Sequence, residues 1–309
     1  MIQMEQLQRS KYIQPASAIK ALKNYSSAVA RLKAGARIYR GLRYFNKTYA
    51  LVKPSNTERT SKNTKNIYTA LMDCLPSWHD YPKRSRSIIC SSSTDYADKY
   101  TGPRVKYSNS DRIGSLYCIL PKNGGRIGIC PDDDIWNSFP IVNMRWQTDH
   151  MDGFNRLFAK IFYDLYANSN VSYMNLKHRR DIDEMNGDEM KQFLEEAEKE
   201  LTDIESALEH IENKVIVSDI RNNKLKGKKT WTEYFDGLLN PKKNGFTLQT
   251  IEEYSVAKSS EYEVWTDSDC LMICMSYFNK AGERIGSDFR NVNAFFKRAT
   301  GKESNLIKT

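Results

Sequence analysis

The chain lacks the long apolar runs that membrane-spanning helices need. Such a helix takes about 18 or more consecutive apolar residues, and no stretch of these 309 residues approaches that length. The first residues, with Gln3, Glu5, Gln6 and Gln8, also lack the apolar segment of a secretory signal. We therefore expect a protein of the cytoplasm with no membrane partner.

Cysteine and histidine are too few and too widely spaced to predict a metal centre. None of the six cysteines forms a CxxC pair, and the four histidines are dispersed along the chain. Structural zinc needs closely spaced pairs of these ligands. The sequence therefore predicts no metal, and it predicts reduced thiols that are mostly buried.

Charge of one sign is in excess. The 47 basic residues outnumber the 38 acidic ones, which gives a formal net charge of +9. Long-range electrostatics then favour anionic partners. Nucleic acid, an acidic protein and a dinucleotide all satisfy this condition, so charge alone does not choose among them.

The hydrophobic pattern alternates between the period of a helix and that of a strand, which predicts an α+β protein. Gly35 stands where the first helix needs a C-terminal cap, and Ser93 or Thr94 can cap the third. The segments 115–120 and 126–130 flank an Asn-Gly-Gly turn, which predicts a β-hairpin. The predicted helices are 15–34, 68–74 and 95–100, and the predicted strands are 37–42, 87–90, 115–120, 126–130, 264–265 and 270–275.

A helical segment interrupts the β-rich sequence. Residues 154–166 have apolar side chains at helical spacing, and a second stripe runs from Met190 to Val215 as one long predicted helix. That helix either packs on its own domain or forms a partner-binding coiled coil. The basic run 221–229 is predicted to be a loop. We predict two domains: a core of 1–150 and 241–309, and a helical insertion of 151–240.

Two glutamates, Glu261 and Glu263, flank Tyr262 just before a predicted strand. In an extended segment alternate side chains point to the same side, about 6–7 Å apart. Paired carboxylates of this kind divide the work at glycosidic carbons, where one stabilises positive charge and the other handles a proton or orients a nucleophile. A solvent-facing acidic edge has the same pattern.

Three short motifs occur in a fixed order along the chain. They are Ile38-Tyr39-Arg40-Gly41-Leu42, then Ile88-Ile89-Cys90-Ser91-Ser92-Ser93, then Glu261-Tyr262-Glu263-Val264. In this order they resemble the arginine, serine and Glu-x-Glu motifs of the arginine-serine-glutamate class of ADP-ribosyltransferases. The motifs are short, so their order on the expected strands carries the resemblance.

The resemblance implies a split β-sandwich core with an N-terminal helix and a large helical insertion. It also implies an enzyme that cleaves NAD and transfers ADP-ribose to a protein acceptor, in a bacterial or phage effector. Glu263 would stabilise the cation formed as nicotinamide leaves, Ser91 would orient Glu263, and Glu261 would engage the acceptor, with arginine as the expected target. The NAD-binding residues would be Arg40, which holds a phosphate and the adjoining ribose, together with Gly41, Ser92 and Ser93.

Several alternatives remain open at the level of sequence. The serine motif matches either as Cys90-Ser91-Ser92 or as Ser91-Ser92-Ser93. Arg40 can be an ordinary strand arginine, Ser91 a turn residue and Glu263 an exposed strand start. Two other functions fit the chain: a basic module that binds nucleic acid or protein without catalysis, and an NAD glycohydrolase on the same fold.

Overall fold

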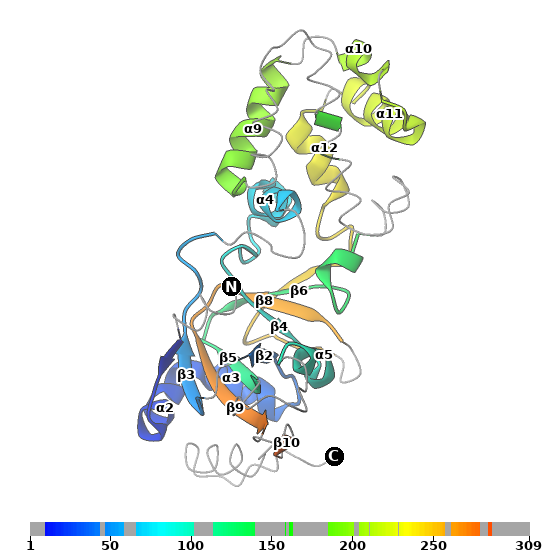
Figure 1. Ribbon diagram of the computed structural model, residues 1–309. Helices are drawn as coiled ribbons and strands as arrows, with labels where there is room; N and C mark the ends of the chain where they lie inside the picture. Colours follow the sequence, from blue (N-terminus) through cyan, green and yellow to red (C-terminus); the bar gives the residue numbers. More distant parts are fainter. Residues whose placement is uncertain are drawn as a thin grey trace. The chain divides into compact units, whose positions relative to one another are not determined.

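The computed structural model divides the chain into two compact units, each described here by itself (Figure 1). The sheet unit comprises Met1–Asn56, Arg86–Asp133 and Thr247–Thr309, and the helical unit comprises Thr57–Ser85 and Asp134–Phe246. The structure describes residues 10–43, 47–58, 66–101, 114–139, 158, 161–162, 185–200, 204–209, 211–227, 229–256, 261–278 and 284–285.

The sheet unit is built on one antiparallel sheet, so the chain is α+β as the sequence predicts. The strand order is β1-β3-β9-β5-β2-β4-β8-β6-β7, and β10 pairs with β9. The strands are β1 (Ser10–Tyr12), β2 (Tyr39–Arg43), β3 (Tyr49–Val52), β4 (Ile88–Ser91), β5 (Gly114–Pro121), β6 (Arg126–Ile129), β7 (Thr247–Thr250), β8 (Glu263–Thr266), β9 (Cys270–Phe278) and β10 (Arg284–Ile285), and the helices of this unit are α2 (Pro15–Ala21), the 3-10 turn η1 (Leu22–Tyr25), α3 (Ser26–Lys33) and α5 (Thr94–Lys99).

The helical unit contains the remaining described elements. They are α4 (Ile67–Cys74), the 3-10 turns η2 (Pro76–Trp78) and η3 (Ile135–Asn137), α9 (Gly187–Glu200), α10 (Ile204–Glu209), α11 (Lys214–Ile220), the π-helical turn η4 (Arg221–Leu225) and α12 (Trp231–Leu238). Its core is aromatic. Phe162 and Phe235 pack with Phe158 and Trp231, at ring-centroid distances between 4.5 and 6.0 Å.

The N-terminal helix is present, with one interruption. The predicted helix 15–34 forms as α2, η1 and α3, and Pro15 is its first residue. Gly35 has a φ of 95°, and its N–H donates to the carbonyl of Leu32 at 3.1 Å. The predicted cap is therefore correct, because a left-handed residue at this place is the usual way to end a helix.

The predicted hairpin 115–130 is wrong, although its two strands and its turn exist. β5 pairs with β2 and β9, whereas β6 pairs with β7 and β8. Three strands separate β5 from β6 in the sheet, a distance of about 19 Å if the sheet were flat. The connection 122–125 spans at most about 17 Å and contains a tight turn, so the sheet must curve back to bring β6 beside the end of β5.

Central strands are buried on both faces. Every residue of β5 and of β8 is buried, and Tyr117, Trp265 and Leu271 have 1% or less of their surface exposed. The strand predicted at 270–275 is part of β9. Five of the six cysteines are buried, Cys274 is half-buried, and all are free thiols, as predicted.

The contact-based division differs from the predicted domain boundaries. The sequence predicts residues 57–85, 134–150 and 241–246 as part of the core, but all three segments group with the helices. All eight residues of α4 are buried, so this helix needs neighbours on every side. It packs on α9, and the Asn66 side chain donates to the Met185 carbonyl at 2.7 Å.

The long helix predicted from the stripe 190–215 is not continuous. α9 and α10 hold the first part of the stripe, but Asn213 is extended and caps a new helix, α11, by accepting from the N–H groups of Val215 and Ile216. Because the helix restarts there, the face of the stripe changes, and Val215 is 42% exposed. The predicted helix 154–166 lies outside the described residues, except for positions 158, 161 and 162.

The basic run 221–229 is more than the predicted loop. Its first five residues form η4, and within it Lys224 is buried. The Lys224 ammonium forms an ion pair with Glu198, donates to the Lys229 carbonyl at 3.0 Å and lies 4.8 Å from the Trp231 ring centroid. The turn is helical because this lysine is anchored inside the unit.

α5 packs so closely on β2 that only a glycine fits at position 41. A Cβ atom at Gly41 would lie 2.1 Å from the backbone oxygen of Ala97. We therefore expect Gly41→Ala to lower the free energy of unfolding by about 1–3 kcal/mol, the usual cost of overpacking, in urea titrations followed by circular dichroism. The matched control is Gly237→Ala in α12, where an added Cβ meets no atom within 4 Å and should stabilise by up to about 1 kcal/mol. An unchanged midpoint for Gly41→Ala would contradict this packing.

Candidate functional site

The three motif strands are neighbours in the sheet. β4 lies between β2 and β8, so the strands that carry Arg40, Ser91 and Glu263 are adjacent although Arg40 and Glu263 are more than two hundred residues apart in sequence. Strand order does not show which side chains lie opposite one another. The residue-by-residue register of the pairing shows this.

Ser91 and Glu263 are direct cross-strand partners. The β4–β8 pairing puts Ile88 opposite Thr266 and ends with Ser91 opposite Glu263. Side chains of directly opposed residues lie on the same face, with Cβ atoms roughly 4.5–5.5 Å apart. The two side chains therefore leave the sheet on the same face, and both residues are buried, at 3% and 7% exposure. The Ser91 hydroxyl itself accepts from the Ser93 N–H at 3.0 Å.

Backbone hydrogen bonds hold Glu263 from the other side as well. Its N–H donates to the Asp132 carbonyl at 2.8 Å, and its carbonyl accepts from the Cys130 N–H at 2.9 Å. A strand with neighbours on both edges has little freedom to shift. The Glu263 carboxylate is thus carried on a rigid, buried position, which removes the alternative of an exposed strand start.

The serines beyond Ser91 continue the contact with the glutamate motif. The Ser92 N–H donates to the Tyr262 carbonyl at 2.9 Å, and the Ser92 hydroxyl accepts from the Tyr262 N–H at 2.8 Å. The Ser93 hydroxyl donates to Glu261 Oε1 at 3.2 Å. Ser91 and Ser93 therefore each stand beside one glutamate, and Ser92 fixes the backbone between them.

The two glutamates have different surroundings. Glu263 is buried inside the strand, whereas Glu261 precedes β8 and is exposed. Ser93 also accepts from the Tyr96 N–H at 3.2 Å and so caps α5, as one of the two predicted capping residues. One hydroxyl thereby joins the exposed carboxylate to the start of α5.

Arg40 reaches the same end of the sheet but is anchored in the protein. β2 and β4 pair at one position, Tyr39 with Ser91, and beyond it the Arg40 guanidinium donates to the Ile89 carbonyl. Tyr39 shares a face of the sheet with Ser91 and Glu263 through these pairings. Because successive strand residues point to opposite faces, the Arg40 side chain leaves β2 on the face opposite to Ser91 and Glu263. The contact of Arg40 with NAD stays a prediction. Its observed hydrogen bond joins β2 to β4 next to their single paired position.

The surroundings of the Arg40 guanidinium are mostly apolar. Burial lowers the pKa of Arg40, while the nearby Cys90, Cys270 and Tyr100 side chains raise it. Gly41 has a packing role beside it, as the place where the α5 backbone contacts β2.

Sequence reasoning missed a pair of tyrosines on α5. Tyr96 and Tyr100 are four residues apart, their ring centroids are 5.7 Å apart, and the Tyr100 hydroxyl donates to the Tyr96 hydroxyl at 3.3 Å. Tyr100 is 48% exposed. The available signal was the i, i+4 spacing of two aromatics directly after the serine motif.

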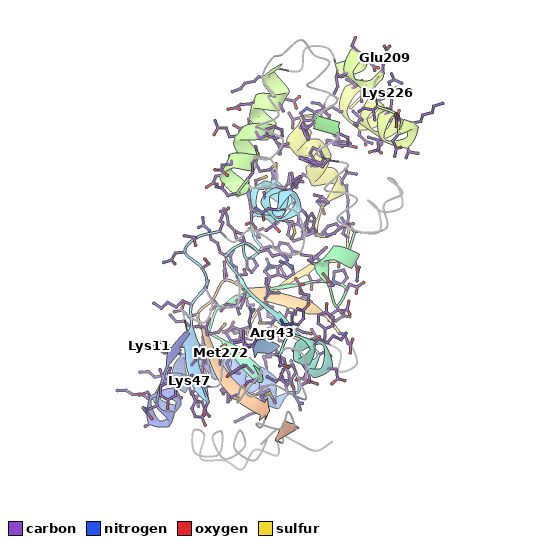
Figure 2. The ribbon with its side chains drawn as sticks, viewed as in Figure 1. Lys11, Arg43, Lys47, Glu209, Lys226 and Met272 are labelled. Atoms are coloured by element: carbon purple, nitrogen blue, oxygen red, sulfur yellow. The ribbon has the colours of Figure 1, made fainter. Side chains whose placement is uncertain are left out.

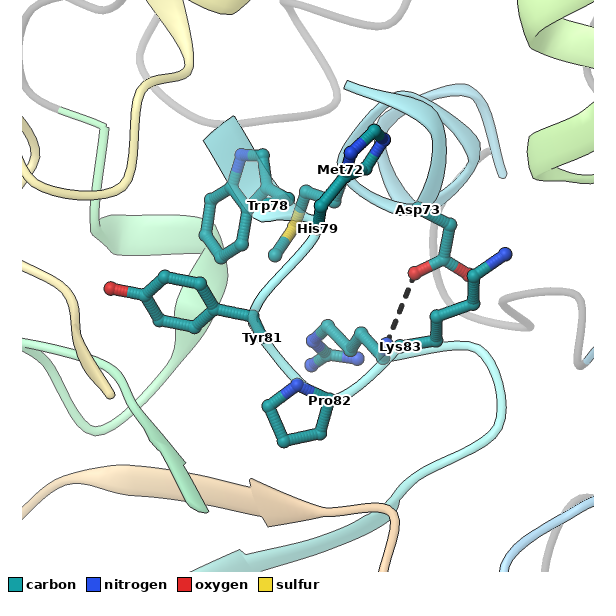
Figure 3. Close-up of a pocket in the computed structure, with 8 residues that line it drawn as sticks. Met72, Asp73, Trp78, His79, Tyr81, Pro82 and Lys83 are labelled. Carbon is teal, nitrogen blue, oxygen red and sulfur yellow. Dashed lines mark hydrogen bonds between the residues drawn. The ribbon is translucent and has the colours of Figure 1, made fainter. Parts of the chain in front are cut away.

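A small pocket in the helical unit has a volume of about 50 Å³ (Figure 3). The Trp78 indole N–H donates to the Leu239 carbonyl, and the Tyr81 hydroxyl donates to the Phe246 carbonyl, so the polar groups of both rings are used within the protein. Asp73 Oδ1 accepts from the backbone N–H of Arg84 at 3.0 Å. The pocket is lined by Met72, Asp73, Trp78, His79, Tyr81, Pro82, Lys83 and Arg84.

Basic side chains occur in both units, and Figure 2 shows Lys11 and Lys47 near the β1 end of the sheet and Lys226 by α11. Within the described part of the chain, no helix is long and apolar enough to cross a membrane. The same residues contain no group of three or more His, Cys, Asp or Glu side chains that could hold a metal ion.

Comparison with protein-family models, with curated proteins and with solved structures finds no match to this chain. The site is therefore interpreted from its own geometry and from the sequence motifs.

Asp73 makes the stability of the helical unit depend on pH. Burial raises the pKa of this carboxyl from 3.8 to about 6, and the hydrogen bond with Ser85 offsets only part of the effect. The folded state then holds the proton more tightly than the unfolded state. The stability contributed by the protonated carboxyl is complete below pH 3.8 and is lost as pH rises through 6.

We therefore expect Asp73→Asn to gain stability over the wild type between pH 4 and 6, and to level off at up to about 3 kcal/mol, at 1.36 kcal/mol per pKa unit. Urea unfolding followed by tryptophan fluorescence at several pH values measures the difference. Glu195→Gln, at an exposed position in the middle of α9, is the control and should track the wild type. A constant difference from pH 4 to 8 would refute the assignment.

Proposed function

We propose that this protein is an ADP-ribosyltransferase that cleaves NAD in the cytoplasm and transfers ADP-ribose to a protein. One observation carries the proposal: the β4–β8 register sets Ser91 opposite a buried Glu263, at the end of a strand that also neighbours β2. The motif resemblance requires Ser91 and Glu263 to lie next to each other. The local sequence of neither segment determines that they pair.

The fold that we propose for the sheet unit is the split β-sandwich of that family. Two features support it. β2 and β4 pair at only one position, so the sheet is nearly divided there, and the short β5–β6 connection requires the two parts of the sheet to curve toward each other.

Glu263 is suited to the bond-breaking step. As the bond between the ribose C1′ and the nicotinamide nitrogen breaks, that nitrogen keeps the electron pair and nicotinamide leaves neutral. Positive charge then develops on the ribose. A buried, preorganised carboxylate stabilises such charge strongly, because water does not screen it. In this proposal Ser91 orients Glu263, which also binds the ribose hydroxyls.

Glu261 is suited to the second step. Its exposed carboxylate can receive an acceptor from solution and pair with a guanidinium through two parallel hydrogen bonds. An acceptor nitrogen attacks C1′ and loses a proton to give the ADP-ribosylated product. Following the motif resemblance, Arg40 would hold a phosphate of NAD, a group that a guanidinium binds through paired donors. Ser92, Ser93 and Gly41 shape the backbone around that position.

The central test is release of nicotinamide from NAD by the purified chain. We expect Glu263→Gln to reduce the rate about 100-fold or more, because it removes the charge that stabilises the transition state and keeps the shape of the side chain. Glu195→Gln makes the same change at an exposed position of α9 and should leave the rate unchanged. Equal rates for the wild type and Glu263→Gln would refute the proposal and favour a basic binding module.

A second variant separates transfer from hydrolysis. Glu261→Gln should keep most of the nicotinamide release measured without acceptor, and should lose labelling of a guanidino acceptor by at least about tenfold, the factor of one lost charge-assisted hydrogen bond. Mass spectrometry of the acceptor gives the second readout. A wild type that releases nicotinamide but labels no acceptor would identify an NAD glycohydrolase instead.

A further inference from the structure

The tyrosine pair on α5 has an exposed aromatic surface beside the glutamate motif. Tyr96 and Tyr100 project from one side of the helix, since residues four apart lie above one another. Tyr100, at 48% exposure, is one of the three most exposed large hydrophobic residues in the described part of the chain. A ring held by a neighbouring ring and a hydroxyl contact loses little entropy when it binds another group.

One atom connects this surface to Glu261. The Ser93 hydroxyl donates to Glu261 Oε1 and accepts from the Tyr96 N–H, both at 3.2 Å. This N–H is the backbone amide of Tyr96, so a single shared oxygen joins the carboxylate to the first turn of α5, the helix from which the tyrosine pair projects. At the other end of the pair, Tyr100 lies close enough to Arg40 to affect its charge equilibrium.

A cation already occupies one face of this surface. The Lys99 ammonium lies 4.5 Å from the centroid of the Tyr96 ring, within the range of a cation–π contact. A negative carboxylate beside an electron-rich ring also attracts cations and repels anions. The aromatic rings and the carboxylate together favour a positively charged ligand. Such a ligand needs a flat face that stacks on a ring and N–H groups that donate to Glu261.

We propose that Tyr96, Tyr100 and Glu261 together bind the guanidinium of the acceptor, so that the two tyrosines determine the specificity of transfer. This inference rests on the proposed function. The guanidinium stacks on the exposed tyrosine ring and donates to Glu261, which leaves one nitrogen directed toward the ribose carbon. A guanidinium suits this place better than an ammonium because it is planar and weakly hydrated.

The experiment measures nicotinamide release and transfer to agmatine in the same samples. Tyr100→Leu and the double variant Tyr96→Leu with Tyr100→Leu remove the aromatic rings but keep apolar volume, and Tyr100→Phe keeps the ring. The control is Tyr12→Leu. Tyr12 is a comparable tyrosine at the other end of the sheet, 43% exposed and with Lys47 at 5.4 Å from its ring centroid.

We expect the KM for agmatine to rise about 5- to 30-fold in the two leucine variants, the factor that a cation–π contact is worth, with nicotinamide release in the absence of acceptor within twofold of wild type. Tyr100→Phe and Tyr12→Leu should retain the wild-type KM. Circular dichroism confirms that α5 and the sheet remain folded in each variant.

The outcomes separate the two proposals. If the wild type releases no nicotinamide, the proposed function fails, and this inference fails with it. If nicotinamide is released but agmatine is not modified, or if its KM is the same in all variants, the tyrosines do not bind the acceptor and the NAD-cleaving function stands. A KM that rises equally in Tyr100→Phe would also overturn the stacking role.

Discussion

The register between β4 and β8 is the constraint on which the candidate site depends. A slip by one residue would turn every side chain of a strand to the other face, and it would separate Ser91 from Glu263. Ser92 and Tyr262 fix the register at one end through two hydrogen bonds. At the other side of β8, Gly128 leaves room for the Trp265 ring, because a Cβ there would lie 2.3 Å from Trp265 Cε2. Packing and hydrogen bonding thus specify one alignment.

Local signals in the sequence predicted the elements well. Helix caps at Gly35 and Ser93 are set by residues close in sequence, and the buried strand in β9 has an unmistakable apolar run. Local signals do not show which strands pair with each other. An Asn-Gly-Gly turn between two strand-like segments predicts a hairpin, but the turn defines only where the chain reverses. Here β2, β4 and β8 lie between β5 and β6 in the sheet, and that arrangement depends on contacts between residues far apart in sequence.

The same limit explains the errors in the helical unit and the partial outcome for the site. A stripe of apolar residues at spacings of three and four does not show where a helix breaks, and Asn213 was not recognised as a cap within it. The motif order likewise predicted that the strands of Arg40, Ser91 and Glu263 would be neighbours. It did not predict which face of β2 carries Arg40, since that depends on the single pairing between Tyr39 and Ser91.

The Glu-x-Glu motif shows how one short pattern acquires two chemical environments. The strand begins between its two carboxylates, so Glu263 is enclosed by neighbouring strands while Glu261 stays at the surface next to the capped end of α5. A buried carboxylate acts strongly on charge formed close to it, and an exposed one exchanges partners with solution at little cost. Glu261 precedes β8, so only Glu263 is placed by the pairing of the strand, and the position of the strand start gives the two glutamates different surroundings. Exposure, more than spacing, therefore distinguishes the two carboxylates of this motif, and the different roles proposed for them rest on that difference.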